Sequence, residues 1–132
     1  YISLESVLAY HQVIPESVIG VTSVSSRKTN QFESSWGVFS YRSLKPRYMF
    51  GYQVVETNQR IKYKIAELEK AVLDYLYLNS SIKSFADFEG LRWNREQLQH
   101  LINRSVFSKY LKIFNKIALE NRVEQFMEYL NA

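Results

Sequence analysis

The spacing of apolar residues changes about half way along the chain. Residues 38–44 and 60–65 alternate apolar and polar side chains, which is the period of a β-strand. From Leu68 onward, apolar residues recur every three or four positions, which is the period of an amphipathic helix. Strands before helices predict an α+β fold: an N-terminal helix, an antiparallel or mixed sheet of about 4–6 strands, and about 4–5 C-terminal helices.

The first half predicts one helix followed by short strands. A helix is expected from Leu4 to about Gln12, with Ser3 as its N-cap and Pro15 as its stop. The expected strands are residues 18–24, 29–33, 38–44, 48–55 and 60–65, and the expected turns are residues 25–26, 34–37 and 57–59.

The last of these strands has the clearest alternation in the chain. Its period of two predicts two faces, one apolar and one cationic. The apolar side chains Ile61, Tyr63 and Ile65 are expected to face the core, and Arg60, Lys62 and Lys64 to face water or a ligand. In the strand over residues 38–44, Phe39 and Tyr41 should lie opposite Ser40 and Arg42.

The second half predicts a buried central helix and shorter capped helices. The central helix presents Leu68, Ala71, Val72, Tyr75 and Leu76 on one face, and Leu73 and Tyr77 add apolar area on the other side, so burial more than half way around the helix is expected. Ser84 is expected to cap a helix that ends at Gly90, Asn94 to cap the next with Gln97 at the capping-box position, and Ser108 to open another. The inward residues of these helices and of a last one are Leu98, Leu101, Ile102, Tyr110, Leu111, Phe114, Ile117, Val123, Phe126, Met127 and Leu130.

Composition limits the number of domains and the classes of protein to which the chain can belong. A chain of 132 residues with 46% hydrophobic and 15% aromatic residues predicts one folded domain over residues 1–132. The absence of cysteine excludes disulfides and thiolate sites, and it fits a reducing compartment. No apolar run approaches about 18 residues, so no membrane span is expected. Because residue 1 is tyrosine and leads into a helix start, the sequence is expected to be part of a longer polypeptide.

Positive charge is concentrated in residues 27–64. That block has a net charge of +6, from eight Lys/Arg and two Asp/Glu, whereas the remainder has a net charge of −2. The cations are Arg27, Lys28, Arg42, Lys45, Arg47, Arg60, Lys62 and Lys64. Cations gathered on one part of a domain indicate a surface for a polyanion, and the alternative is an ordinary solvated sheet face. Because the interleaved aromatics fall on core-facing positions, the pattern favours phosphate contacts over base stacking.

Residues that could support catalysis are few. His11 lies on the apolar stripe of the first helix, which favours packing, and His100 is expected at the surface. Glu67 and Glu69 beside Lys70 loosely suggest a metal-dependent nuclease, but the spacing is wrong, and acidic residues also favour a helix N-terminus. No catalytic residue, metal ligand or cofactor is therefore expected.

Three segments together resemble the C-terminal domain of AbiEi-family antitoxins. The first is YISLESVLAYH at residues 1–11, running to Ile14-Pro15-Glu16. The second is residues 22–42, with Thr22-Ser23-Val24, Arg27-Lys28-Thr29, Phe32-Glu33 and GVFSYR at residues 37–42. The third is Ile65-Ala66 followed by EKAVLDYLYL at residues 69–78. The chain departs from the family where a Thr/Ser-Pro pair often precedes Glu-Lys-Ala, because Glu67-Leu68 stands there instead.

The resemblance implies a function that composition does not indicate. Members of this family are the antitoxin and transcriptional-regulator halves of bacterial type IV toxin–antitoxin, or abortive infection, systems, which are cytoplasmic. An upstream winged helix-turn-helix would bind operator DNA and repress the operon. This domain would counteract a nucleotidyltransferase-like toxin without a stable complex and would add DNA contacts of its own.

Two other classes remain open at this point. The chain could be a protein-interaction or dimerisation module of another regulator, and a homo-oligomer would fit that class. A metal-dependent nuclease is the third alternative, and a carboxylate-bound metal site would favour it.

Overall fold

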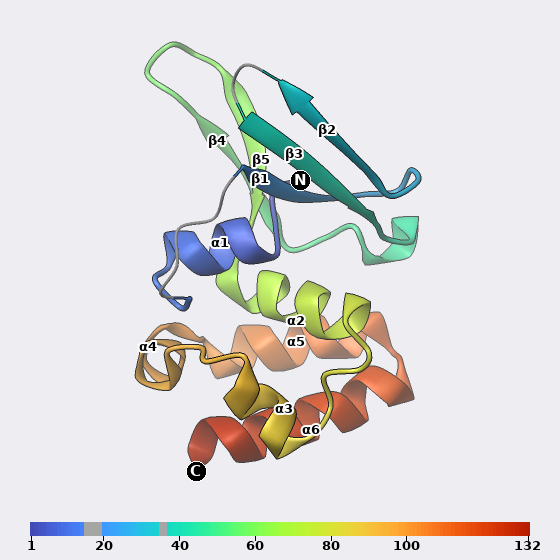
Figure 1. The fold of residues 1–132 in the computed structure, drawn as a ribbon, viewed down its shortest axis with the longest axis vertical. Helices are drawn as coiled ribbons and strands as arrows, with labels where there is room; N and C mark the ends of the chain where they lie inside the picture. Colours follow the sequence, from blue (N-terminus) through green and yellow to red (C-terminus); the bar gives the residue numbers. More distant parts are fainter. Residues whose placement is uncertain (15–19, 35–36) are drawn as a thin grey trace.

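The computed structural model has an α+β architecture and describes residues 1–14, 20–34 and 37–132. The strands are β1 (Val21–Ser25), β2 (Asn30–Ser34), β3 (Gly37–Ser43), β4 (Tyr52–Glu56) and β5 (Lys62–Ala66). The helices are α1 (Glu5–Tyr10), the 3₁₀ turn η1 (Pro46–Tyr48), α2 (Leu68–Leu78), α3 (Phe85–Gly90), α4 (Arg95–Leu101), α5 (Arg104–Phe114) and α6 (Ile117–Asn131). The strands lie at one end, α1 and α2 lie beneath them, and α3 to α6 form the other end (Figure 1). The predicted fold class is therefore confirmed.

The strands form two groups, of which the first is mixed. β3 pairs with β1 in parallel and with β2 in antiparallel orientation, and β4 pairs with β5 as an antiparallel hairpin. Ser34 lies opposite Gly37, so β2 and β3 form a hairpin at the position of the turn predicted for residues 34–37, and residues 35–36 lie outside the described residues.

A short extended segment at Tyr1–Ser3 joins the two groups of strands. Ile2 bridges Ser23 of β1 on one side and Ile65 of β5 on the other. Its main chain accepts from Ala66 N at 2.8 Å and donates to Lys64 O at 2.9 Å. The predicted role of Ser3 as an N-cap is wrong, because Ser3 is buried and its hydroxyl donates to a side chain of α2.

The first helix is shorter than predicted. It covers Glu5–Tyr10, and the main chain of Gln12 turns back with a φ of 59°. Pro15 and the first residues of the predicted strand 18–24 lie outside the described residues.

The β4–β5 hairpin corrects the prediction that its apolar face is buried. Ile61 is 58% exposed and Tyr63 is 38% exposed, and only Ile65, near the base, is half-buried. The hairpin extends beyond the helices (Figure 1), so no core covers its outer part.

The strand predicted at residues 48–55 begins later, at Tyr52. Pro46 starts η1, and Tyr48 is buried with its ring stacked on Phe114, at 4.8 Å between centroids. An aromatic side chain held in the helical core in this way cannot also belong to the sheet.

The core lies between α2 and the other helices. α2 buries the predicted residues Leu68, Ala71, Val72 and Leu76, and α6 buries Val123, Phe126 and Leu130 as predicted. No helix in the described parts of the chain is long and apolar enough to span a membrane.

The C-terminal helices confirm two predicted caps and correct a third. Ser84 forms a capping box with Asp87, and Asn94 accepts from the Gln97 main chain at 3.1 Å. The helix predicted to open at Ser108 begins earlier, at Arg104, because the Asn103 side chain caps it.

Two residues predicted to face inward are instead exposed. Leu101, at the end of α4, is 37% exposed, and Ile117 is 75% exposed. Ile117 follows the left-handed Asn115, which ends α5, so it starts α6 rather than continuing the stripe of α5.

The capping box at α3 supports a first prediction. Ser84→Ala is expected to lower the free energy of unfolding by about 1 kcal/mol, because the Asp87 N–H loses its acceptor. Urea denaturation followed by circular dichroism would measure this change. Ser81→Ala, at an exposed position in the preceding turn, serves as the control. Equal stability of both variants would show that this cap contributes nothing.

Candidate functional site

The most unusual site is a buried ion pair within α2. Lys70 and Asp74 lie one helical turn apart, and both side chains are fully buried. Their nearest polar atoms, Lys70 Nζ and Asp74 Oδ1, are 2.5 Å apart. In the sequence, Lys70 stands out only as a neighbour of Glu69, and Asp74 only as one residue of the segment EKAVLDYLYL. The signal that could have found the pair is an oppositely charged i, i+4 couple inside an otherwise apolar helix.

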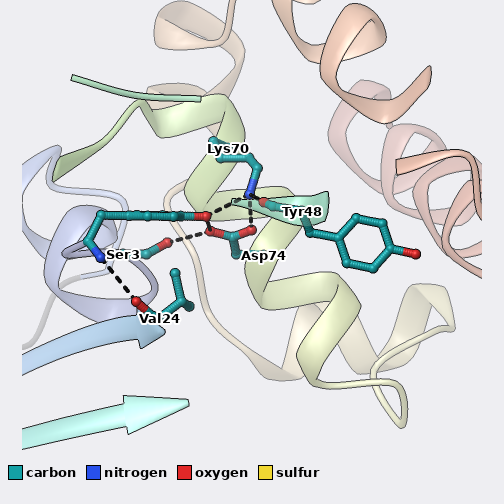
Figure 2. A network of polar contacts seen from close by, with 6 residues as sticks. Ser3, Val24, Tyr48, Lys70 and Asp74 are labelled. Carbon is teal, nitrogen blue, oxygen red and sulfur yellow. Dashed lines mark hydrogen bonds and ion pairs between the residues drawn. The ribbon is translucent and has the colours of Figure 1, made fainter. Parts of the chain in front are cut away.

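The ammonium of Lys70 has an acceptor for each of its three protons. Besides Asp74, it donates to the Tyr1 hydroxyl and to the Tyr48 main-chain oxygen, both at 2.7 Å (Figure 2). Three aromatic rings surround it, with centroids 4.5 Å away for Phe50, 4.9 Å for Phe114 and 5.3 Å for Tyr1. Such ring faces attract a cation, so they offset part of the hydration that the ammonium loses on burial.

The carboxylate of Asp74 is equally well bonded. Its Oδ2 accepts from the Tyr1 hydroxyl at 2.8 Å and from the Ser3 hydroxyl at 2.9 Å, while Oδ1 accepts from Lys70. Ser3 lies to the left of Asp74 and Lys70 lies above it (Figure 2), and they bond to different oxygens of the carboxylate. Among the described residues, no buried side-chain nitrogen or oxygen lacks a hydrogen-bond partner.

Burial opposes the charge on each partner. It raises the pKa of Asp74 and lowers the pKa of Lys70, and the opposite charge of each partner acts against both shifts. Burial also raises the pKa of the Tyr1 phenol, and the Asp74 charge adds to that rise, so this hydroxyl stays protonated and can donate. Each charge therefore depends on the other, as in other buried ion pairs.

This arrangement is suited to fixing positions rather than to reacting. Neither Lys70 nor Asp74 lines any of the three grooves described for this part of the chain. The pair connects α2 to the Tyr1–Ser3 segment and to η1, which are distant in sequence. We therefore assign this network, hereafter the Lys70 network (Tyr1, Ser3, Tyr48, Lys70 and Asp74), a positioning role.

The predicted cations do not share one face. Five of them gather where β1 and β3 end and η1 begins; we call this group the basic edge. The Ser25 oxygen accepts from Leu44 N at 2.7 Å, and the Thr29 hydroxyl accepts from Ser43 N at 3.0 Å, which holds the β1–β2 connection beside the end of β3. The basic edge consists of Arg27, Lys28, Arg42, Lys45 and Arg47.

Within the basic edge, four cations are exposed and one is engaged. Arg42 is half-buried, and its guanidinium donates to the Leu78 main-chain oxygen at 3.1 Å. Arg47 lies over the Tyr48 ring, 5.0 Å from its centroid, and remains exposed.

The other three cations lie on the β4–β5 hairpin. Arg60, Lys62 and Lys64 are exposed, and the tip of the hairpin is far from the η1 end of the sheet (Figure 1). Lys62 lies opposite Glu56 in the ladder, which partly offsets its charge, and Lys64 lies over the Tyr52 ring, 5.4 Å from its centroid.

The glutamates and histidines considered as catalytic candidates are either hydrogen-bonded to other residues or differ only in their exposure to solvent. Glu67 accepts from the Tyr110 hydroxyl at 3.0 Å, and Glu69 accepts from Asn103 N at 2.8 Å. His11 is half-buried as predicted, and burial lowers its pKa; His100 is exposed on α4, also as predicted. Among the described residues, no group of three or more histidine or carboxylate side chains could hold a metal ion.

In the comparisons with known proteins, no family model matches this chain, and no curated protein matches it.

Proposed function

We propose that this chain is a non-catalytic antitoxin and transcriptional-regulator domain of the AbiEi type. In this proposal it acts in the bacterial cytoplasm, counteracts a nucleotidyltransferase-like toxin without forming a stable complex, and supports repression of its operon. Sequence-specific DNA recognition would belong to a winged helix-turn-helix elsewhere in the polypeptide.

The observation that carries the proposal is the convergence of the three segments that resemble this family. Tyr1 and Ser3 come from the first segment, and their hydroxyls donate to Asp74 of the third. Val24, from the second segment, donates its main-chain N–H to Tyr1 O at 2.9 Å. A resemblance distributed over three separate stretches therefore corresponds to one structural unit around the Lys70 network.

The basic edge supports the auxiliary DNA role. Of its four exposed cations, Arg27, Lys28 and Lys45 lie on connections between elements and Arg47 lies in η1, where they can approach a phosphate backbone without entering a groove. Phosphate contacts of this kind position a protein on DNA but do not read sequence.

Co-expression with the toxin tests the antitoxin role. The full-length protein would be produced in bacteria together with the nucleotidyltransferase-like protein encoded beside it, and growth would be recorded. We expect growth to resume. A variant truncated before α2 serves as the negative control, because it lacks Lys70 and Asp74. Continued growth arrest, with the intact protein folded and abundant, would reject this function.

The salt dependence of DNA binding tests the basic edge. Replacing Arg27, Lys28, Lys45 and Arg47 with glutamine is expected to reduce the slope of log K against log salt, since each phosphate contact contributes about 0.9 to that slope. Fluorescence anisotropy with a non-operator duplex would measure it.

The matched control replaces Arg60, Lys62 and Lys64 with glutamine. We expect this hairpin variant to change the slope by less than about 0.9, which is the contribution of one phosphate contact. An equal or larger effect of the hairpin variant would place the phosphate surface on the hairpin instead.

A second function, protein interaction, is favoured by one observation. Three apolar side chains are exposed on a single hairpin, with Val54 at 59%, Ile61 at 58% and Tyr63 at 38%. Val54 lies opposite Lys64 and Tyr63 lies opposite Val55, so the side chains of Val54 and Tyr63 lie on opposite faces of the hairpin, and each face offers an exposed apolar side chain to a partner.

A further inference from the structure

A groove lies between the β4–β5 hairpin and the helices on one side of it. Its volume is about 670 Å³. One wall is a face of the hairpin, where Gln53 lies opposite Ile65 and Val55 lies opposite Tyr63. The facing residues come from α1 and the turn after it, from the end of α4, and from the start of α2. We propose that this groove binds an extended segment of a partner protein that carries an arginine or lysine among aliphatic residues.

The walls of the groove are apolar and aromatic. Tyr10, on α1, is 74% exposed, and Leu101, at the end of α4, is 37% exposed, although both are large side chains. Tyr63 and Ile65 continue this surface on the hairpin. A partner that covered these side chains would remove apolar area from water, which favours association.

Two carboxylates are the only formally charged groups that line the groove at neutral pH, among the residues that the structure describes. They belong to Glu67 and Glu69, and no Lys or Arg is among the described lining residues. His11 also lines the groove, and burial lowers its pKa, which disfavours a positive charge on its ring. The groove is therefore locally acidic in a chain whose net charge is +4.

Each carboxylate has one oxygen in use and one open. Glu67 Oε1 accepts from Tyr110, and Glu69 Oε2 accepts from Asn103. Their other oxygens accept no hydrogen bond from the described residues, and no buried side-chain oxygen there lacks a partner. Glu67 is half-buried and Glu69 is 7% exposed, so the free oxygen of Glu67 is the more accessible of the two to a donor.

The combination of apolar walls and carboxylates favours a ligand that is both apolar and cationic. A purely apolar ligand would cover the carboxylates without satisfying them, which is unfavourable. An anion would be repelled. An arginine or lysine packs its aliphatic stem against apolar side chains while its charged head reaches a carboxylate, and aliphatic neighbours would cover the rest of the walls. This role is separate from the DNA role of the basic edge, which lies on the other group of strands.

Peptide titration followed by NMR of the isotope-labelled chain tests the proposal. The probe is an acetylated and amidated octapeptide that alternates leucine and arginine, and its counterpart has glutamate in place of arginine. We expect the arginine peptide to shift the amide signals of Tyr10, His11, Tyr63 and Leu101, and the glutamate peptide to leave them unchanged.

Two variants and one control complete the test. Glu67→Gln keeps an acceptor for Tyr110 but removes the charge, and it is expected to weaken binding roughly fivefold. Tyr10→Ser removes part of an exposed wall and is expected to weaken binding without changing the melting temperature. Glu128→Gln, at an exposed position on α6, is expected to change nothing.

Several outcomes would overturn the inference. These are binding of both peptides with similar affinity, no shift at the groove residues, or unchanged affinity in Glu67→Gln. Concentration-dependent dimerisation that protects the same residues in the absence of peptide would show that a second copy of the chain occupies the groove.

Discussion

Lys70→Met is expected to lower the free energy of unfolding by about 3–5 kcal/mol, because it leaves the buried Asp74 without its cation. Asp74→Asn is expected to cause a loss of similar size, because it leaves a buried ammonium without its carboxylate. Urea denaturation at pH 7 would measure both losses. Lys109→Met, on the exposed side of α5, is the control and should be nearly neutral.

The double variant distinguishes charge from packing. With both charges removed, neither partner is left ionised and unpaired, so the combined loss should be smaller than the sum of the two single losses by at least about 1 kcal/mol. Strict additivity would contradict an ion pair that acts as one unit.

The pH dependence of the stability of Lys70→Met provides an independent test of whether the loss comes from the charge on Asp74. Without the ammonium, only the hydrogen bonds from Tyr1 and Ser3 still act against the burial that raises the pKa of Asp74 above its ordinary value of 3.8. At a pH between 3.8 and the raised pKa of Asp74, the folded state binds more protons than the unfolded state, so the free energy of unfolding of this variant rises as the pH falls. We expect the deficit of Lys70→Met relative to the parent to shrink from pH 7 toward pH 4. A deficit that is constant over this range would mean that the loss is one of packing.

Gly51→Ala is expected to lower the free energy of unfolding by roughly 2–4 kcal/mol, from left-handed strain together with overpacking. Gly51 has a φ of +74°, and a Cβ there would lie 2.8 Å from Lys70 Cγ and 3.0 Å from Lys70 Cβ. Lys70 cannot move away without breaking its three hydrogen bonds. Thermal or urea denaturation would measure the loss.

The chain contains a matched control for this substitution. Gly90 lies at the end of α3, where an added Cβ would have no atom within 4 Å, and its φ is not in the left-handed region. Gly90→Ala should therefore change stability by less than about 1 kcal/mol. Similar losses at both glycines would show that the contact between Gly51 and Lys70 is not the cause.

The Lys70 network and the groove differ in what they predict for function. Damage to the network should unfold or loosen the whole unit and thereby remove every activity. Damage to the groove or to the basic edge should leave the fold intact and remove one binding property each. Stability measurements on each variant therefore allow a functional loss to be assigned to a surface.

Local patterns were sufficient for the elements whose contacts are close in sequence. Ser84 and Asn94 cap their helices through residues three positions later, and the buried face of α2 follows its own period. Hairpins also form between neighbouring stretches, so β2–β3 and β4–β5 could be predicted. In each case the physical cause lies within a few residues of the effect.

Local patterns failed where a distant partner decides the environment. Ser3 has the side chain of an N-cap, but its hydroxyl instead donates a hydrogen bond to Asp74, 71 positions away. Ile61 and Tyr63 alternate like residues of a buried strand, but the fold leaves Ile61 58% exposed and Tyr63 38% exposed.

The amino-acid sequence by itself determined the α+β order of elements, the principal caps and the concentration of cations in residues 27–64, because these depend on composition and short-range spacing. Only the tertiary structure decided that Lys70 and Asp74 are buried together, that Tyr1–Ser3 joins the two groups of strands, and that the cations divide between an edge and a hairpin. These features depend on which surfaces meet when the chain folds, and burial changes the energy of a charge far more than its sequence neighbours do.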